Sequence, residues 1–326
     1  MSVPPPDPSS PPPPVKPRPE DCCGHDCAVC VFDLYDQELT IWEKECERWR
    51  REARRSALST TTERVRSTSP ALETEAYRDF LILALEKSTP GVIEILLQPV
   101  KDHVSPLAIG LGQHLVVRGV DVATGTAFSR QLTPFDVDEE GGTFRLMIKL
   151  KPWGRLSAIA GSWKVGDALA LRGPLGGLAY RPNQFSKIWM LAIGVGIAPL
   201  LSYITAILDD EEEDTMISLH YGNRRYEDVC QKSKLDQWSS YWNFQVTHYL
   251  SGETEETLKG KRKYGEKVET SRLDADMVRK AICGGPNSDG RDEAVFIVGS
   301  PDFEINTGDA ISDLFKGGVF RFTNLT

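Results

Sequence analysis

Short apolar runs, separated by glycine, proline and polar turns, fill the chain from about residue 75 to residue 182. The runs are FLILALEKS at 80–88, VIEILLQPV at 92–100, QHLVVRGVD at 113–121, TFRLMIKL at 143–150 and ALALRGPLG at 168–176. Several short strands at this spacing are typical of a small barrel or sandwich. The pattern therefore predicts an antiparallel β-barrel domain over residues 75–182.

The pattern changes after residue 187 to strands that alternate with helices. Apolar strand runs begin at 187, 216, 244 and 294, and helical runs follow at 198–208, 227–238 and 307–315, before GVFRF near the end of the chain. Alternation of this kind predicts a parallel sheet with helices on both faces. The predicted fold is thus an α+β two-domain protein, with an α/β nucleotide-type domain over residues 183–326. The longest apolar stretch contains Gly and Pro where a strand should turn into a helix, so we expect no transmembrane segment.

The region before residue 75 has a different character. Residues 1–19 are rich in proline and are expected to be disordered or polyproline-like, and residues 59–74 have the composition of a linker. Between them, residues 20–58 form a Cys-rich module. Its second half predicts a short amphipathic helix from the spacing of Leu34, Leu39, Trp42, Cys46 and Trp49.

Charge and composition narrow the function. The chain of 326 residues has a formal net charge of −9, which argues against general nucleic-acid binding, because phosphate affinity requires concentrated Lys and Arg. The first residues carry no positive charge before Lys16 and no apolar core, unlike a signal or transit peptide. A cytoplasmic location is the expectation, with a mitochondrial location through an unconventional signal as the alternative.

Cysteines crowd into the segment CCGHDCAVC. Its members are Cys22, Cys23, Cys27 and Cys30. Thiolates this close can bind zinc or an iron–sulfur cluster. Adjacent cysteines seldom both face one ion, and free or redox-active thiols are the alternative, which the sequence leaves open.

Two motifs predict a phosphate clamp on the barrel. Arg130 stands at the end of a predicted strand, two residues before Leu132, and Gly154-Arg155-Leu156-Ser157 opens a predicted helix. The N–H groups of a helix start and an arginine can share one phosphate. A surface arginine and an ordinary helix cap would be the alternative for either motif alone.

Two strand-end turns predict a nucleotide crevice in the second domain. AIGVGIAPL at 192–200 contains Gly194, Gly196, Ala198 and Pro199, and VGSPDF begins at Val298. Glycines permit close approach of a nucleotide, and both turns would line the crevice at the carboxyl ends of the strands. A tight turn that only packs helix on strand is the alternative for the first of them.

These motifs resemble the NADH-cytochrome b5 reductase branch of the ferredoxin-reductase superfamily. The resemblance runs through LGQHLVVRG, RGPLGG, YRPNQF, MLAIGVGIAP and VGSPDF, and the N-terminal module with VFDLY resembles an oxidoreductase-like domain. In this family R-x-Y-[ST]-P holds FAD, which implies FAD-binding roles for Arg130, Thr133 and Pro134, with Leu132 in place of the tyrosine. The G-x-[LM]-S helix start implies the same for Gly154, Leu156 and Ser157, and Lys149 matches a strand that passes the cofactor.

The pyridine-nucleotide half departs more from the family pattern. Gly194-Val195-Gly196 lacks one family glycine, and Val298 replaces the family cysteine beside the nicotinamide, although Gly299 and Ser300 remain. The resemblance implies that Thr133 and Val298 lie nearest the reacting rings. Asp228 matches an acidic position that disfavours the 2′-phosphate of NADPH, so NADH is expected, with NADPH as the alternative because Arg224 and Arg225 stand nearby.

The resemblance implies an FAD-dependent oxidoreductase that passes electrons from NADH to a haem protein such as cytochrome b5, or to another one-electron acceptor. A flavin- or nucleotide-binding scaffold with relaxed catalysis is the alternative, because Leu132, Val195 and Val298 depart from the family where hydride passes. Phe320 and Phe322 are candidates for shielding the flavin ring, or else belong to a core-facing last strand.

Overall fold

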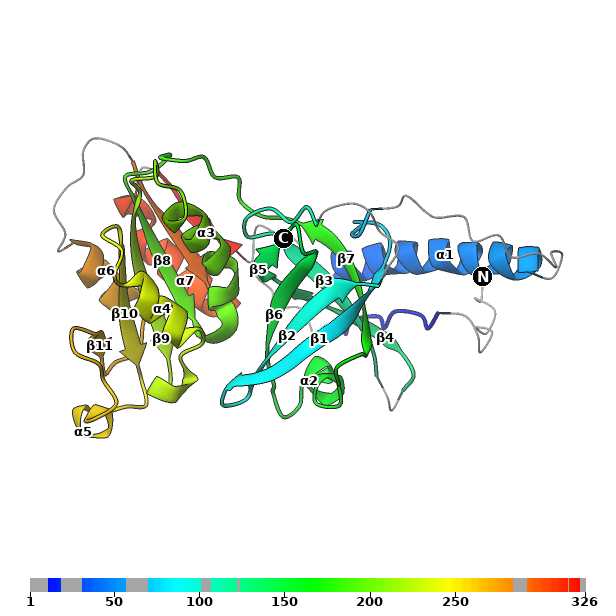
Figure 1. The fold of residues 1–326 in the computed structure, drawn as a ribbon, viewed down its shortest axis with the longest axis horizontal. Helices are drawn as coiled ribbons and strands as arrows, with labels where there is room; N and C mark the ends of the chain where they lie inside the picture. Colours follow the sequence, from blue (N-terminus) through cyan, green and yellow to red (C-terminus); the bar gives the residue numbers. More distant parts are fainter. Residues whose placement is uncertain are drawn as a thin grey trace.

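A computed structural model shows two globular domains side by side and a long N-terminal helix (Figure 1). It describes residues 11–18, 31–56, 70–100, 107–121, 124–283, 292–315 and 317–322, without the side chains of residues 52–56 and 283. In that part of the chain, no helix is both long and apolar enough to cross a membrane.

The first domain is a curled antiparallel sheet of seven strands. Its order is β4-β3-β7-β1-β2-β6-β5, and the strands are β1 Arg78–Thr89, β2 Val92–Pro99, β3 His114–Val120, β4 Ala127–Leu132, β5 Phe135–Asp138, β6 Thr143–Lys149 and β7 Ala168–Leu175. Alternate side chains such as Phe80, Leu115, Phe144 and Leu171 fill its interior. The helix α2, Arg155–Ala160, lies at one end. The predicted antiparallel domain is therefore confirmed.

The second domain has a six-stranded parallel sheet in the order β11-β10-β9-β8-β12-β13. The strands are β8 Lys187–Ile193, β9 Met216–Asn223, β10 Phe244–Leu250, β11 Lys267–Glu269, β12 Glu293–Val298 and β13 Val319–Arg321. The helices are α3 Ala198–Leu208, α4 Lys232–Trp238, α5 Glu255–Leu258, α6 Ala275–Cys283 and α7 Pro301–Ile311, with short 3₁₀ turns at Gly194–Ile197, Tyr226–Asp228 and Ser312–Leu314.

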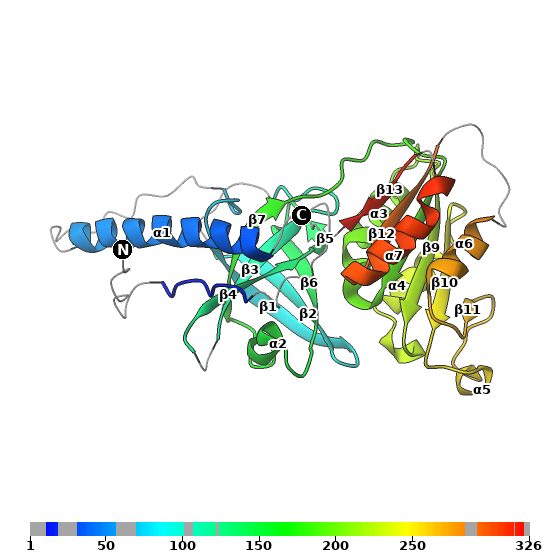
Figure 2. The same ribbon diagram turned by 180° about the vertical axis from the view of Figure 1, so that it is seen from behind.

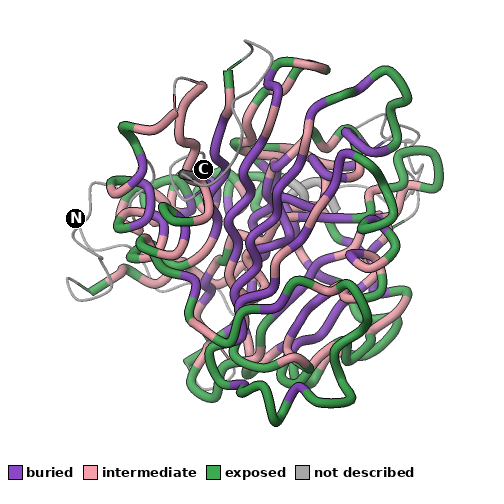
Figure 3. Tube along the Cα trace, turned by 90° about the vertical axis from the view of Figure 1, so that its left-hand side faces the viewer, coloured by how far each residue is buried: buried purple, intermediate pink, exposed green. Residues whose placement is uncertain are grey.

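Helices cover both faces of this sheet, as the alternating pattern predicted. Side chains of α3 and α4 join one buried cluster and those of α6 and α7 another, and Figures 1 and 2 show the two pairs on opposite faces. The strands between them are buried along most of their length (Figure 3). From β8, the strands β9, β10 and β11 are added on one side and β12 and β13 on the other, so the order of strands reverses between β8 and β12. Ligands bind at such a switch point in open α/β sheets.

The two domains share a packed interface. Phe135 and Met147 of the first domain join the buried cluster that surrounds α3. The hydroxyl of Tyr203 on α3 donates to the carbonyl oxygen of Leu111, at 3.1 Å, or to that of Leu178, at 2.8 Å, and accepts from the N–H of Leu178. The domains are thereby held so that the carboxyl ends of the parallel strands face the barrel.

The N-terminal region packs on the barrel. The helix α1 spans Val31–Ser56, 26 residues, and is longer than the short helix that the apolar spacing predicts. Residues 11–18 belong to the segment that was expected to be disordered or polyproline-like. Here Val15 donates to the carbonyl oxygen of Ala127 at 3.1 Å, and Ala127 donates to that of Pro13 at 3.2 Å. Prolines favour an extended backbone, and the free edge of β4 provides hydrogen-bonding partners for it.

Candidate functional site

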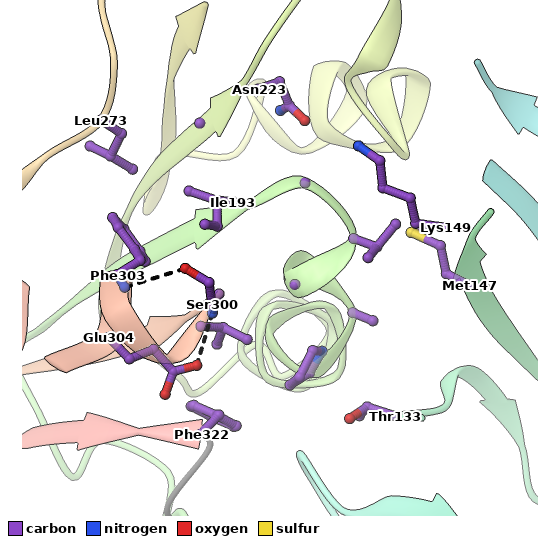
Figure 4. A pocket seen from close by; sticks show the side chains of 18 of the residues that line it. Thr133, Met147, Lys149, Ile193, Asn223, Leu273, Ser300, Phe303, Glu304 and Phe322 are labelled. Atoms are coloured by element: carbon purple, nitrogen blue, oxygen red, sulfur yellow. Dashed lines mark hydrogen bonds between the residues drawn. The ribbon is translucent and has the colours of Figure 1, made fainter. Parts of the chain in front are cut away.

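A cleft of about 740 Å³ lies between the two domains. The α/β domain contributes the ends of β8, β9 and β12, through Ile193, Asn223 and Val298. The barrel contributes residues at the ends of β3, β4 and β6. Figure 4 shows Lys149 and Met147 entering from the barrel side, opposite Asn223 and Ile193.

The structure brings many of the predicted site residues together in this cleft. They are Leu132, Thr133, Lys149, Gly194, Gly196, Ala198, Pro199, Asp228, Val298, Gly299 and Ser300. They come from two domains and are far apart in sequence. Their roles toward a cofactor remain predictions.

The other predicted residues lie outside the lining of the cleft. Pro134 is buried beside Thr133. Leu156 belongs to the barrel core, so only its backbone is available to a ligand. The hydroxyl of Ser157 accepts from the N–H of Lys151 at 2.7 Å and fixes the loop before α2, and a Cβ at Gly154 would lie 2.8 Å from that hydroxyl oxygen.

Arg130 and α2 occupy the same end of the barrel. The Arg130 guanidinium lies 5.5 Å from the centre of the Phe128 ring, and its side chain is exposed. A Cβ at Gly119 would lie 2.6 Å from both the Phe128 ring and Ile159 of α2. The side chains of Phe128 on β4 and Ile159 on α2 therefore both pack over this glycine. This arrangement is compatible with the predicted phosphate clamp.

The two glycine turns are in close contact at the switch point. A Cβ on Gly196 would lie 3.2 Å from the carbonyl oxygen of Val298, and one on Gly299 would lie 2.6 Å from Ile193. Gly194 differs from both, because its φ is +53° and nothing lies within 4 Å of a Cβ placed there. The hydroxyl of Tyr221 donates to the Gly194 carbonyl oxygen at 2.9 Å and supports this turn from below. Gly194 therefore offers bare backbone to the cleft.

Glu304 is a cleft residue that the sequence did not indicate. Its side chain is 1% exposed, and its Oε1 accepts a hydrogen bond of 2.9 Å from the N–H of Gly299 (Figure 4). Ser300 caps α7 through a bond of 3.3 Å from the N–H of Phe303. Together these bonds fix the turn after β12. Glutamate side chains are seldom fully buried, so only the fold identifies this one.

Two residues that line the cleft each have a buried polar atom without a partner among the described residues. These atoms are Nε2 of His114 and Nδ2 of Asn223. Burial, with a smaller effect of the Arg172 charge, lowers the pKa of His114 to about 4, so its ring is neutral at pH 7. Buried polar atoms normally have partners, so His114 and Asn223 are candidates for contacts with a ligand.

Charged groups surround the cleft. Asp228 accepts from the N–H of Arg225 at 3.0 Å within its own turn. Of the two neighbouring arginines, Arg224 lines the cleft, whereas Arg225 makes an exposed ion pair with Glu227 at 3.5 Å. Lys149, Lys151 and Arg272 add positive charge to the lining. The cleft combines cations with bare backbone, which suits phosphates.

The remaining sequence predictions have different outcomes. Phe322 is 7% exposed, lines the cleft and packs in the core, and Phe320 packs against the same cluster.

The predicted metal site, Cys22, Cys23, Cys27 and Cys30, lies outside the described residues, so it remains a prediction. Among the residues that the structure does describe, no cluster of three or more His, Cys, Asp or Glu could hold a metal.

This architecture defines a two-domain reductase fold, an antiparallel FAD-type domain followed by a parallel NAD-type domain. The cytochrome b5 reductase domain of Ulva prolifera nitrate reductase has the same fold, with a TM-score of 0.64 at 21% identity over 78% of this chain and 99% of that one. Family profiles match as an oxidoreductase FAD-binding domain at 93–180, an oxidoreductase NAD-binding domain at 190–307 and an N-terminal oxidoreductase-like domain at 8–51.

Two relatives that match most of the chain identify the family. The chain is 30% identical to the human protein named NADH-cytochrome b5 reductase-like and 33% identical to the mouse protein of the same name. The matches cover 82% of this chain, 82% of the human protein and 83% of the mouse protein. The chain therefore belongs to the NADH-cytochrome b5 reductase-like family of flavoprotein NAD(P)H-dependent oxidoreductases. The resemblance seen in the sequence is confirmed.

Proposed function

We propose that the chain takes electrons from NADH through bound FAD and passes them singly to a haem protein of the cytochrome b5 type. The observation that carries the proposal is the single cleft in which the barrel residues Thr133 and Lys149 face the turn at Val298. FAD, when bound, supplies the conversion between two-electron and one-electron chemistry.

The residues of the cleft fit a flavin and a nicotinamide nucleotide. On the barrel side, Arg130 and Ser157 lie outside the lining, and Arg130 and the loop fixed by Ser157 would hold the pyrophosphate. His114, whose Nε2 has no partner among the described residues, lines the cleft. On the opposite side, Gly194 presents bare backbone and Val298 closes the end of β12. This chain's contribution is to bind, orient and exclude water, and hydride transfer needs no strong acid or base between the two rings.

NADH is the proposed donor. The Asp228 carboxylate lines the cleft, and a like charge there repels the 2′-phosphate of NADPH. Of the two neighbouring arginines, only Arg224 lines the cleft. Its positive charge would favour NADPH.

A scaffold with relaxed catalysis is the second candidate. It is favoured by Val298, which is 6% exposed and lines the cleft where the family pattern has cysteine. Valine has similar bulk but no thiol, so binding would persist while transfer slows.

A visible spectrum of the full-length protein, followed by anaerobic NADH addition, tests the proposal. A flavin band that bleaches on mixing supports the reductase, and subsequent oxidation by cytochrome b5 supports the acceptor. A flavin band that persists with NADH supports the scaffold. No flavin band after FAD is added would refute the reductase and the pyrophosphate clamp of Arg130 and Gly154–Ser157, and would leave only a scaffold that binds a nucleotide without flavin.

A further inference from the structure

Helix α1 is fastened to the barrel by a buried ion pair. Arg172 of β7 is 2% exposed and Glu38 of α1 is 7% exposed. Nε and Nη2 of Arg172 donate to Oε1 of Glu38 at 2.9 and 2.6 Å, and Nη1 donates to the carbonyl oxygen of Thr74 at 3.2 Å. Removing one partner of such a pair leaves an uncompensated charge in the interior, which is costly.

Further contacts complete this interface. The hydroxyl of Tyr77 donates to the second oxygen of Glu38 at 2.7 Å. The ring of Tyr77 lies 4.1 Å below the guanidinium of Arg118, which in turn donates to Glu45 of α1 at 2.6 Å. The helix is therefore placed by directional bonds along its buried side, and its first half follows the outer face of the sheet (Figure 1).

The face under α1 continues into the cleft. Val116 of β3 pairs with Arg172, and His114, two residues before Val116 on the same strand, pairs with Leu175 across a register shift in which β7 has one extra residue. Along β3 itself, His114 and Val116 point to the same face of the sheet. Leu115 and Val117 point the other way, into the barrel core. At the end of this face the 4% exposed His114 lines the cleft, and its Nε2 has no partner among the described residues. The cleft residue His114 is thus two residues along β3 from Val116, the strand partner of Arg172.

We propose that Glu38 is a positioning residue for the cleft: by pairing with Arg172 it couples the docking of α1 to the binding of FAD. The proposal rests on the proposed function, because it takes FAD as the occupant. A flavin held against His114 would act on β3, the strand that contains both Val116, the strand partner of Arg172, and Arg118, which pairs with Glu45 of α1. Coupling of this kind is reciprocal, so docking of α1 must also strengthen FAD binding.

Hydrogen–deuterium exchange of the full-length protein, with FAD removed and then restored, tests the coupling. We expect FAD to slow exchange in the first half of α1, and Glu38→Gln to abolish that effect and to weaken FAD binding roughly 5-fold or more, within the usual range for coupled sites. Glu38→Asp should recover part of the affinity. Glu43→Gln removes the same charge from an exposed position of the same helix and should behave like the wild type.

Tyr77→Phe is the milder variant if Glu38→Gln does not fold. It removes only the hydroxyl that donates to Glu38 and should lower FAD affinity in the same direction. The coupling is refuted if FAD binds the wild type without slowing exchange in α1, or if the folded Glu38 or Tyr77 variants bind FAD as tightly as the wild type. Failure of the wild type to bind FAD at all would instead refute the proposed function.

Discussion

The N–H of Gly299 donates a hydrogen bond of 2.9 Å to the carboxylate of Glu304, and this bond ties the turn after β12 to the first turn of α7. Glu304 is 1% exposed and lines the cleft. Gly299 directly follows Val298, the residue that the resemblance places beside the nicotinamide. We therefore expect the Glu304 carboxylate to help hold Val298 in place.

We expect Glu304→Ala to lower the rate of flavin reduction by NADH about tenfold or more while leaving the flavin spectrum unchanged. The N–H of Gly299 would lose its acceptor, which costs about 1–3 kcal/mol for a buried group, and the turn would move. Glu304→Gln keeps an oxygen at the same place and should retain most of the rate. Equal losses in both variants would show that the charge, rather than the hydrogen bond, is what matters. Stopped-flow absorbance at the flavin band gives the rate.

Val298→Cys tests whether the substituted residue limits hydride transfer. The Val298 side chain is 6% exposed and faces the cleft, and cysteine has a similar volume, so the fold should tolerate the change. We expect flavin reduction by NADH to become several-fold faster, with unchanged FAD affinity. Val295→Cys, at a buried position of the same strand away from the cleft, serves as the control. An unchanged rate in Val298→Cys favours the scaffold.

Several regular elements of the α/β domain could be predicted from the side-chain pattern, whereas α5, β11 and α6 were not. The helix predicted at residues 198–208 spans Ala198–Leu208, where Pro199 occupies the first turn, and the strand predicted at 216–223 spans Met216–Asn223. Helix α7 was predicted from Thr307, but it begins at Pro301 after a Ser300 cap. A Ser-Pro helix start was present in the sequence and would have found it.

Other features depend on long-range packing that no local pattern records. Helix α1 continues past Trp49 because its charged residues are good helix formers and pair along the helix, as Glu47 and Arg51 do at 3.0 Å; an apolar spacing rule does not detect such a segment. Glu38 and Arg172 look like solvated charges in sequence, and only the fold brings them together. Thr133 and Val298 were placed in one cleft through a family resemblance rather than through residue spacing.

Arg130→Ala should weaken FAD binding if this arginine holds the pyrophosphate. A hydrogen bond to a charged group contributes about 1.5–3 kcal/mol, so we expect affinity to fall about 10- to 150-fold and to become less dependent on salt. Arg181→Ala, an exposed position outside the cleft lining, is the matched control. Fluorescence quenching during FAD titration gives both constants. Equal affinities in the two variants would remove Arg130 from the clamp.

Asp228→Ser should shift the preference toward NADPH. The carboxylate that repels the 2′-phosphate would be gone, while Arg224 would remain in the lining, so we expect kcat/KM for NADPH to rise about tenfold relative to that for NADH. Glu227→Gln is the control, since Glu227 pairs with Arg225 and Lys261 at the surface. An unchanged ratio in Asp228→Ser would mean that this residue does not set the nucleotide preference.

His248 should make the protein less stable in acid. It is 0% exposed, neither ring nitrogen has a partner among the described residues, and burial lowers its pKa to about 4, whereas the unfolded value is about 6.5. The unfolded state therefore binds the proton first. The stability that the neutral ring contributes is fully present above about pH 6.5, falls as the pH drops toward 4 and is constant below it. Lys232, Glu266 and Asp236 lie near enough to modify the shift.

Urea unfolding of His248→Leu at pH 7.5 and pH 5.0 measures this contribution. Between these two pH values the wild type should lose about 2 kcal/mol more than the variant, because one fewer proton is taken up on unfolding. His114 and His220, whose pKa values are also lowered to about 4, remain in the variant and give it a residual acid sensitivity. Val246→Ala, on the same strand and without a titrating group, should lower stability equally at both pH values. A pH dependence of His248→Leu parallel to that of the wild type would show that His248 is already protonated or exposed in the folded protein at pH 5.0.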